Sequence, residues 1–358
     1  MLRILGYADR LSVAPGGRLA VKVSCEGIRR YRAELRRIIQ GDINPEGPGY
    51  RDEAIEFDLG GPFDGRRQEI HAGSCGIVAR PEPLAGLESF TLAVAVAPTL
   101  PEQRGGILAH RDSESGAGLC LTLEGDRGAT LTVGTAGSGE AAVSTGRPMY
   151  RDHWYVVVAS CDAEAGSLRI AQLPLRRYAG AADAGEGRAE VGADGFVPAG
   201  ADQPLLIAAL AGADGTTRDH FNGRIEGPRI YGAALAVDPL FAAIARGEED
   251  AELPAPLAAW DFAQGITTQD IQDRSPSGLH GRLINLPARG VAGLRWRGDV
   301  FNWREAPEQY GAIHFHDDDL YDAGWETDFE LAVPEDVRIG VYAVRLVDAE
   351  LGEREAGP

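Results

Sequence analysis

The chain has 358 residues and a formal net charge of −19, and hydrophobic residues make up 44% of it. This composition can bury a sizeable core, so a folded protein of two or three domains is expected. The acidic balance argues against nucleic acid and anionic membranes as partners, because binding to phosphate groups needs clustered Lys and Arg. No run of about 18 apolar residues occurs, so no membrane span is predicted.

The first 66 residues carry the alternation that is typical of half-buried strands. Leu19, Val21 and Val23 would share one face of a strand, and residues 31–36 alternate again. Residues 41–66 are rich in Pro and Gly, so we expect a loop that crosses between domains. Strands at one chain end alone would leave a hydrophobic face bare, so they need partners from elsewhere.

The middle of the chain, residues 67–290, has short strand patterns with turn signals about every ten residues. Helical periodicity is almost missing there, and one helix is predicted at 236–246, where Asp238 would cap it. Many short strands at this spacing predict a β-sandwich. The four cysteines, at positions 25, 75, 120 and 161, form no CxxC pair, so reduced thiols in a cytoplasmic protein are expected.

The last part of the chain returns to the pattern of the first. Residues 329–333 and 340–347 alternate, and these strands also lack partners nearby. Pairing the two ends solves both problems. The predicted fold class is therefore all-β, with an immunoglobulin-like β-sandwich built from residues 1–66 and 291–358 and a larger sandwich of residues 67–290 inserted in it.

Three middle segments resemble a laminin-G or concanavalin A-like jelly roll. They are DHWYVVVASCDAEAGSLRI, HFNGRIEGPRIYGAALAVDPLFAAIARGE and LAAWDFAQGITTQDIQDRSPSGLHGRLINLP. The resemblance implies that the inserted sandwich has this fold. Domains of this kind serve as sugar binders, as protein-interaction modules and as enzymes, so the fold alone leaves the function open.

Three further segments cover nearly the whole chain: GYADRLSVAPGG, QGDINPEGPGYRDE and PEQYGAIHFHDDDLYDAGWETDFELAVPE. They resemble the N-terminal half of the large (beta) subunit of N,N-dimethylformamidase. The resemblance implies an amidohydrolase that cleaves small N-substituted formamides to formate and an amine. It also implies a mononuclear iron, held by two tyrosines and a glutamate in an α/β catalytic domain that follows the matched region. A small helical subunit and a homo-oligomeric full-length form are implied as partners.

We expect that catalytic domain to be absent from this chain, since no βαβ pattern remains to build it. The resemblance therefore assigns no catalytic residue and no cofactor to the chain. The first hypothesis is a non-catalytic region that scaffolds the catalytic domain and the subunit contacts of such an amidohydrolase. The alternative is a stand-alone lectin-like module that binds a carbohydrate or a protein.

One candidate metal site stands out, at His314, His316 and Asp317. In a strand at 312–316, Ile313 and Phe315 would point inward and both histidines outward. Two imidazoles two residues apart can share a metal ion, with Asp317 as an oxygen ligand. The structural alternative is that the carboxylates of residues 317–319 cap backbone N–H groups at the end of the strand.

A second acidic position, Asp273 with Ser275, allows a similar choice. An aspartate in a loop of a lectin-like domain could bind calcium or a sugar hydroxyl. The surrounding sequence, DRSPSG, is rich in turn-forming residues, which favours a structural turn.

Overall fold

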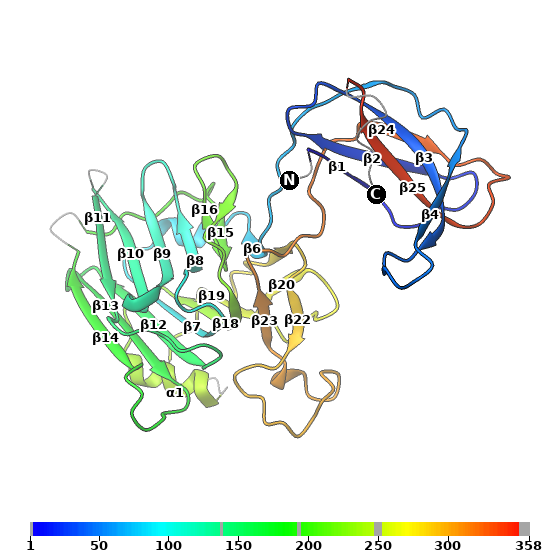
Figure 1. Cartoon of the computed structure of the whole chain (residues 1–358). Coiled ribbons are helices and arrows are strands. Elements are labelled where there is room, and N and C mark those ends of the chain that lie inside the picture. Colours follow the sequence, from blue (N-terminus) through cyan, green and yellow to red (C-terminus); the bar gives the residue numbers. More distant parts are fainter. Residues whose placement is uncertain (1–2, 137–138, 192–194, 247–252, 351–358) are drawn as a thin grey trace. The chain divides into compact units, whose positions relative to one another are not determined.

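The computed structural model describes residues 3–136, 139–191, 195–246 and 253–350 (Figure 1). Contacts between Cα atoms divide the chain into two compact units, one of Met1–Ile70 with Asp322–Pro358 and one of His71–Tyr321. The predicted all-β class is confirmed. In the described part of the chain, the helices are one α-helix and three short 3-10 helices, Glu82–Gly86, Gly125–Arg127 and Pro307–Gln309.

The smaller unit is built from strands of both chain ends, as predicted. One sheet has the order β1-β2-β24, and the other has the order β25-β3-β4 with β5 beside β3. The strands are β1 (Ile4–Ala8), β2 (Arg18–Cys25), β3 (Arg30–Gly41), β4 (Tyr50–Ile55), β5 (Phe63–Asp64), β24 (Phe329–Ala332) and β25 (Val341–Asp348). Alternation places Val21, Val23 and Tyr31 inside, where they pack with Phe329 and Leu331.

The expected loop at 41–66 is wrong in part, because β4 and β5 lie within it. β4 pairs with β3 through a register shift between Ile38 and Gln40. Its sequence, YRDEAI, is polar because it is an edge strand with no residue fully buried. Edge strands protected by charged side chains give little hydrophobic alternation, so the sequence pattern did not reveal this one.

The boundary of the inserted sandwich also differs from the expected position at 291. Residues 291–321 belong to the larger unit, because β23 (Ala312–Phe315) pairs with β18 (Gly223–Tyr231) and β22 (Ala288–Val291) pairs with β23. The end of the predicted terminal segment, residues 351–358, lies outside the described residues.

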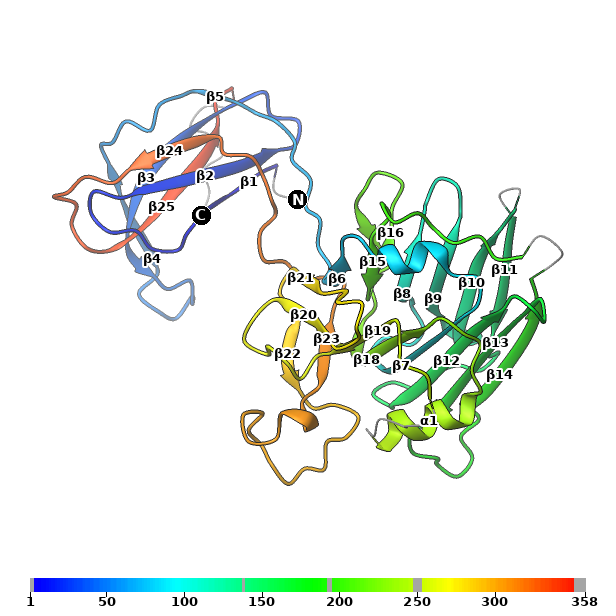
Figure 2. The ribbon, with the colours of Figure 1, turned by 180° about the vertical axis from the view of Figure 1, so that it is seen from behind.

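The larger unit contains one long sheet path that curls into two facing layers (Figures 1 and 2). One layer follows the order β11-β10-β9-β8-β15-β6, and the other follows β18-β7-β12-β13-β14, with β21-β20-β19 between them. The remaining strands of this unit are β6 (Cys75–Val78), β7 (Phe90–Pro98), β8 (Arg104–Arg111), β9 (Gly118–Glu124), β10 (Ala129–Thr135), β11 (Gly139–Ser144), β12 (Tyr155–Asp162), β13 (Ser167–Pro174), β14 (Gly185–Glu190), β15 (Leu205–Ile207), β16 (Leu210–Ala211), β17 (Thr217–Arg218), β19 (Ala258–Asp261), β20 (Asp270–Asp273) and β21 (Gly281–Ile284).

The core of the larger unit lies between these two layers. Leu108, Leu121 and Leu131 from one layer form a single cluster with Val157 and Ile170 from the other. β7 is buried on both faces, because Val94 and Val96 join this core while Ala93 and Ala95 join a second cluster on the other side, so it reads as a continuous apolar run. This explains why β7, FTLAVAVAP, is buried along its whole length.

Helix α1 (Val237–Arg246) covers the outer face of the layer that contains β7 and β12 (Figure 1). Leu240 and Ile244 pack there with Ala95, Val156 and Val158. The predicted helix at 236–246 is therefore confirmed, but Asp238 lies in its first turn rather than at its cap. It leaves part of the outer face of β18 uncovered, and the candidate site lies there.

Candidate functional site

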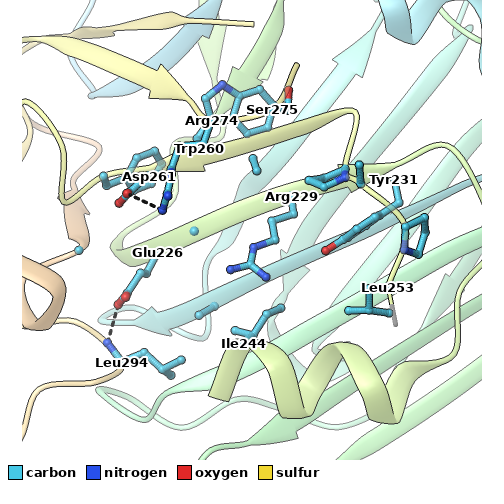
Figure 3. A pocket seen from close by; sticks show the side chains of 18 of the residues that line it. Glu226, Arg229, Tyr231, Ile244, Leu253, Trp260, Asp261, Arg274, Ser275 and Leu294 are labelled. Carbon is cyan, nitrogen blue, oxygen red and sulfur yellow. Dashed lines mark hydrogen bonds and ion pairs between the residues drawn. The ribbon is translucent and has the colours of Figure 1, made fainter. Parts of the chain in front are cut away.

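A cavity of about 550 Å³ opens on the outer face of the sheet, between α1, β18 and the connections of β19 (Figure 3). Its polar walls come from Glu226, Arg229 and Tyr231 on β18 and from Arg274 and Arg295 on loops. Its apolar walls come from Ala95, Ile244, Leu253, Phe262 and Leu294.

Small residues on β7 make room for this cavity. Ala95 lies between Val156 of β12 and Glu226 of β18, and Ala93 lies between Val158 and Arg229. Alanine side chains fill little of the space above the sheet, whereas the valines of β12 are covered by α1. The open space therefore begins above β7 and extends over β18.

A β-bulge brings the polar side chains of β18 to the same face. Glu226 and Arg229 are three residues apart, so a regular strand would point them to opposite faces. The register shifts between them, and Gly227 in the bulge has a φ of 56°. The extra residue returns Arg229 to the face that carries Glu226, and Tyr231 follows two residues later.

Glu226 is a buried carboxylate, with 8% of the residue exposed. Its Oε2 accepts a hydrogen bond from the Leu294 amide at 2.5 Å, and its Oε1 lies 3.8 Å from Nη2 of Arg295. Burial raises the pKa of Glu226, while the Leu294 amide and the Arg295 guanidinium act in the opposite direction.

Arg229 and Tyr231 have unused polar groups in this cavity. The Arg229 side chain points into it between Glu226 and Tyr231 (Figure 3). Within the described residues, neither the Arg229 guanidinium nor the Tyr231 hydroxyl has an ion pair or hydrogen bond, although Tyr231 is only 3% exposed. The neighbouring Arg274 is paired with Asp261 at 3.5 Å.

The predicted histidine pair lies on the same sheet face but in another place, with His314 on β23 and His316 directly after it. Ile313 and Phe315 are fully buried, and His314 and His316 share the outer side with ring centroids 4.1 Å apart. His314 is opposite Arg224 of β18. The predicted inward and outward directions in this strand are therefore confirmed.

The third predicted ligand, Asp317, does not join the histidines. It is exposed, and its backbone N–H donates to Asn222 Oδ1 at 3.1 Å. Asp319 takes the expected place, with its Oδ2 3.3 Å from Nδ1 of His316, because the chain turns at the end of the strand. In the ranges that the structure describes, no group of three or more His, Cys, Asp or Glu side chains could hold a metal ion.

The electrostatics around His314 favour its neutral form. Burial, His316 and Arg224 together lower the pKa of His314 to about 4. Arg224 lies over the Trp154 ring at 5.3 Å from its centroid and 3.5 Å from Asp152. A neutral imidazole could still bind a metal ion, so the metal site at His314 and His316 stays a prediction.

In the turn after β23, the Asp319 carboxylate binds side chains rather than backbone N–H groups. Asp319 accepts a hydrogen bond from the Ser74 hydroxyl at 2.6 Å, and the Ser74 amide donates to the His316 carbonyl at 2.9 Å. The structural alternative correctly predicted a carboxylate that accepts a hydrogen bond at the end of the strand. It was wrong about the donor, which is a hydroxyl and not a backbone N–H group. Near the end of this turn, Tyr321 is 74% exposed rather than packed beneath it.

Asp273 is a structural residue that makes a turn. Its carboxylate accepts hydrogen bonds from the amides of Ala259, Ser275 and Leu279 and from the Ser275 hydroxyl, at 2.7–2.9 Å. These donors use the four acceptor positions of a carboxylate. They leave it no lone pair for calcium or a sugar, as the turn-rich sequence predicted.

Comparison with known proteins agrees with the sequence analysis. The chain is 37% identical to the N,N-dimethylformamidase beta subunit of Alcaligenes sp and 33% identical to that of Paracoccus aminophilus, over 96% of its length in each case. The resemblance to the dimethylformamidase beta subunits is confirmed. The chain spans about half the length of these relatives, 47% of each.

Two family models match separate parts of the chain. Residues 72–239 match the concanavalin A-like lectin/glucanases superfamily, and residues 288–357 match the model described as N,N-dimethylformamidase beta subunit-like, C-terminal. The laminin-G or concanavalin A-like fold of the inserted sandwich is thereby confirmed.

Solved structures resemble the chain only at low identity and low TM-score. A putative carbohydrate binding protein from Bacteroides ovatus is 13% identical, with a TM-score of 0.42 over 76% of this chain and 68% of its own. A SAP-like pentraxin from Limulus polyphemus is also 13% identical, with a TM-score of 0.36 over 59% of this chain and 81% of its own.

The sequence patterns did not predict that Glu226, Arg229 and Tyr231 would line a cavity. The signal that could have found them is the segment GRIEGPRIY, where charged residues interrupt an apolar strand around a Gly-Pro pair. A glycine inside a strand pattern indicates a bulge, and a bulge changes which side chains share a face.

Proposed function

We propose that this chain is a non-catalytic β-sandwich region of a dimethylformamidase-like amidohydrolase. It would scaffold the catalytic domain and the contacts between subunits. The observation that carries this proposal is the similarity to dimethylformamidase beta subunits over 96% of the chain. The reaction of the whole protein would add water to the amide C–N bond of a small N-substituted formamide, which gives formate and an amine.

The chemistry of the best nucleophile candidates supports a non-catalytic role. All four cysteines are free and buried. Burial raises the pKa of Cys75 to about 12 and that of Cys161 to about 11, so these thiols stay protonated and unreactive near neutral pH. Free thiols also support the cytoplasmic location that the sequence predicts.

The partners follow from the same relatives. Their name, beta subunit, implies at least one further kind of subunit, and we propose a small subunit and a catalytic domain as the partners of this chain. The iron that the family resemblance implies would belong to that catalytic domain. In the described residues, no helix is long and apolar enough to cross a membrane.

A chimera tests this proposal. The corresponding half of the Paracoccus aminophilus beta subunit is replaced by this chain and produced with the partner subunit. We expect the chimera to co-purify with the partner and to release formate from dimethylformamide, and the chain alone to release none. Formate release by the chain alone, or a folded chimera that fails to bind the partner, would contradict the proposal.

The second candidate is a lectin-like binding module, which the match of residues 72–239 to a lectin and glucanase superfamily favours. Sugar sites often offer an open aromatic ring. In the larger unit, Trp260 is only 2% exposed and Trp154 lies under Arg224, whereas Trp296 is 40% exposed and could offer such a ring. Binding of the isolated chain to a glycan array, abolished by competition with the free sugar, would favour this candidate.

A further inference from the structure

We propose that the cavity beside α1 binds a small organic monocarboxylate, with the carboxylate group held by Arg229 and Tyr231. This inference goes beyond the proposed function, because it concerns a binding site in the larger unit and no step of amide hydrolysis. It depends on the charge, the unpaired polar groups and the apolar walls of one cavity.

The charges in the cavity leave one positive charge without a partner. Arg274 is paired with Asp261 at 3.5 Å, and Arg295 lies 3.8 Å from Glu226. Among the lining arginines, Arg229 alone forms no ion pair within the described residues, and its charge acts on Glu226 only at longer range. A ligand with a single negative charge would complete this arrangement, because the planar guanidinium matches a carboxylate with two parallel hydrogen bonds.

The Tyr231 hydroxyl adds a second donor. The Tyr231 hydroxyl is not among the fully buried unpaired atoms, so it is open to a ligand in the cavity. Tyr231 is 3% exposed, lines the cavity and has no partner among the residues described. A ligand oxygen bound to Arg229 would also accept this hydrogen bond, since the two side chains lie side by side (Figure 3).

The shape and polarity of the cavity define the rest of the ligand. The volume, about 550 Å³, lies in the range of small-molecule sites. The walls formed by Ile244, Leu253 and Leu294 are apolar, so the carboxylate should carry an aromatic or aliphatic body. The buried Glu226 disfavours ligands with more negative charge, such as phosphate, because like charges repel at short range.

Titration calorimetry of the chain tests the proposal, with benzoate, phenylacetate and hexanoate as probes. Benzamide is the neutral control for benzoate, and inorganic phosphate is the control for charge. We expect at least one carboxylate to bind at millimolar concentration or better, with benzamide and phosphate at least about 10-fold weaker than it. The affinity should fall as the salt concentration rises.

Three variants locate the site. Arg229→Met should weaken carboxylate binding about 10-fold or more, and Tyr231→Phe about 3- to 10-fold. Arg169→Met is the matched control, because Arg169 is an exposed arginine of the same sheet that does not line the cavity. Arg229→Lys keeps the charge without the planar fork and should fall between the wild type and Arg229→Met.

Four results would overturn the proposal. They are equal affinities for benzoate and benzamide, tighter binding of phosphate, unchanged binding by Arg229→Met, and no binding of any of the three carboxylates. If Arg229→Met fails to fold, Arg229→Lys and Tyr231→Phe decide, and unchanged affinity in both would contradict the site. None of these results depends on amidase activity, so this proposal and the proposed function can fail independently.

Discussion

Two arginines in the larger unit show opposite uses of the same side chain. Arg289, on β22, donates through Nη1 and Nη2 to five backbone carbonyls at 2.8–3.0 Å, those of Phe262, Gln264, Gly265, Thr268 and Asp270. Arg229 has no such partner among the described residues. An arginine whose donors are used by the backbone stabilises a loop, whereas one with free donors beside a cavity can recognise a ligand.

The first prediction removes Arg289, the arginine that binds the five backbone carbonyls, and has the largest effect. Arg289→Met leaves five carbonyls of the loop at 262–270 without their donor, so we expect the free energy of unfolding to fall by about 3–5 kcal/mol. Urea denaturation of the chain, followed by tryptophan fluorescence, measures this loss. Arg289→Lys should recover only part of it, because an ammonium group has three donors.

A loss below about 1 kcal/mol in Arg289→Met would show that the backbone carbonyls find other partners. The contrast between the two arginines would then have no energetic basis. Arg169→Met serves as the control here too, because a surface substitution of this kind should change the stability by less than about 0.5 kcal/mol.

The sequence revealed much of the fold because its signals are local. Leu19, Val21 and Val23 alternate, and the two chain ends each lack partners, so pairing them followed from simple packing. The polar edge strand β4 was missed because most of its residues are exposed and only Ile55 packs against the core. The directions of His314 and His316 came from strand alternation alone.

The cavity could not be predicted in the same way. It depends on the register of β18 against β7, which places Ala95 beside Glu226, and on the bulge at Gly227. Register between strands that are distant in the sequence is a tertiary property, and a shift by one residue exchanges the two faces. The contact of Asp319, rather than Asp317, with His316 has a local cause, the shape of the turn after β23, which the run of three aspartates did not reveal.

The second prediction concerns Glu226, the buried carboxylate of the cavity. Its pKa is raised in the folded state, so the folded protein loses stability relative to the unfolded chain as pH rises above about 4.5. Glu226→Gln keeps an acceptor for the Leu294 amide and removes this titration. The variant should therefore gain stability over the wild type as pH rises from 4 to 8.

Chemical denaturation at several pH values measures this difference, and Glu190→Gln on exposed β14 is the control. A stability difference that stays constant with pH would mean that Glu226 titrates as it does in the unfolded chain. The same result would strengthen the argument that this carboxylate repels anions with more than one charge, because an unshifted carboxyl group is ionised near neutral pH.

The third prediction concerns His314, whose titration lowers the stability of the fold as pH falls rather than as pH rises. The expected change in stability is smaller than for Glu226, because His314 is less deeply buried. The folded pKa of His314 is about 4 and the unfolded value is 6.5. The unfolded chain therefore takes up a proton first, and stability is lost as pH falls from 6.5 towards 4. After allowance for partial exposure to solvent, we expect this loss to be about 1–2 kcal/mol.

His314→Gln should reduce this acid-side loss, whereas His71→Gln, at an exposed position, should leave it unchanged. The stability at pH 6.5 and at pH 4.5 is compared for each variant. An equal loss in the wild type and in His314→Gln would show that His314 takes up its proton in the folded protein without cost. Added zinc that protects the wild type but not His314→Gln would instead support the predicted metal site.

The last prediction returns to Arg229 and has the smallest effect on stability. With no ion pair or hydrogen bond to lose in the described residues, Arg229→Met should change the free energy of unfolding by no more than about 0.5 kcal/mol. The same substitution in Arg289 should cost several times more, although both side chains have the same chemistry. Urea denaturation without a ligand makes the comparison. A loss at Arg229 as large as that at Arg289 would mean that the guanidinium is a structural part of the fold, and its free donors would then no longer point to a ligand.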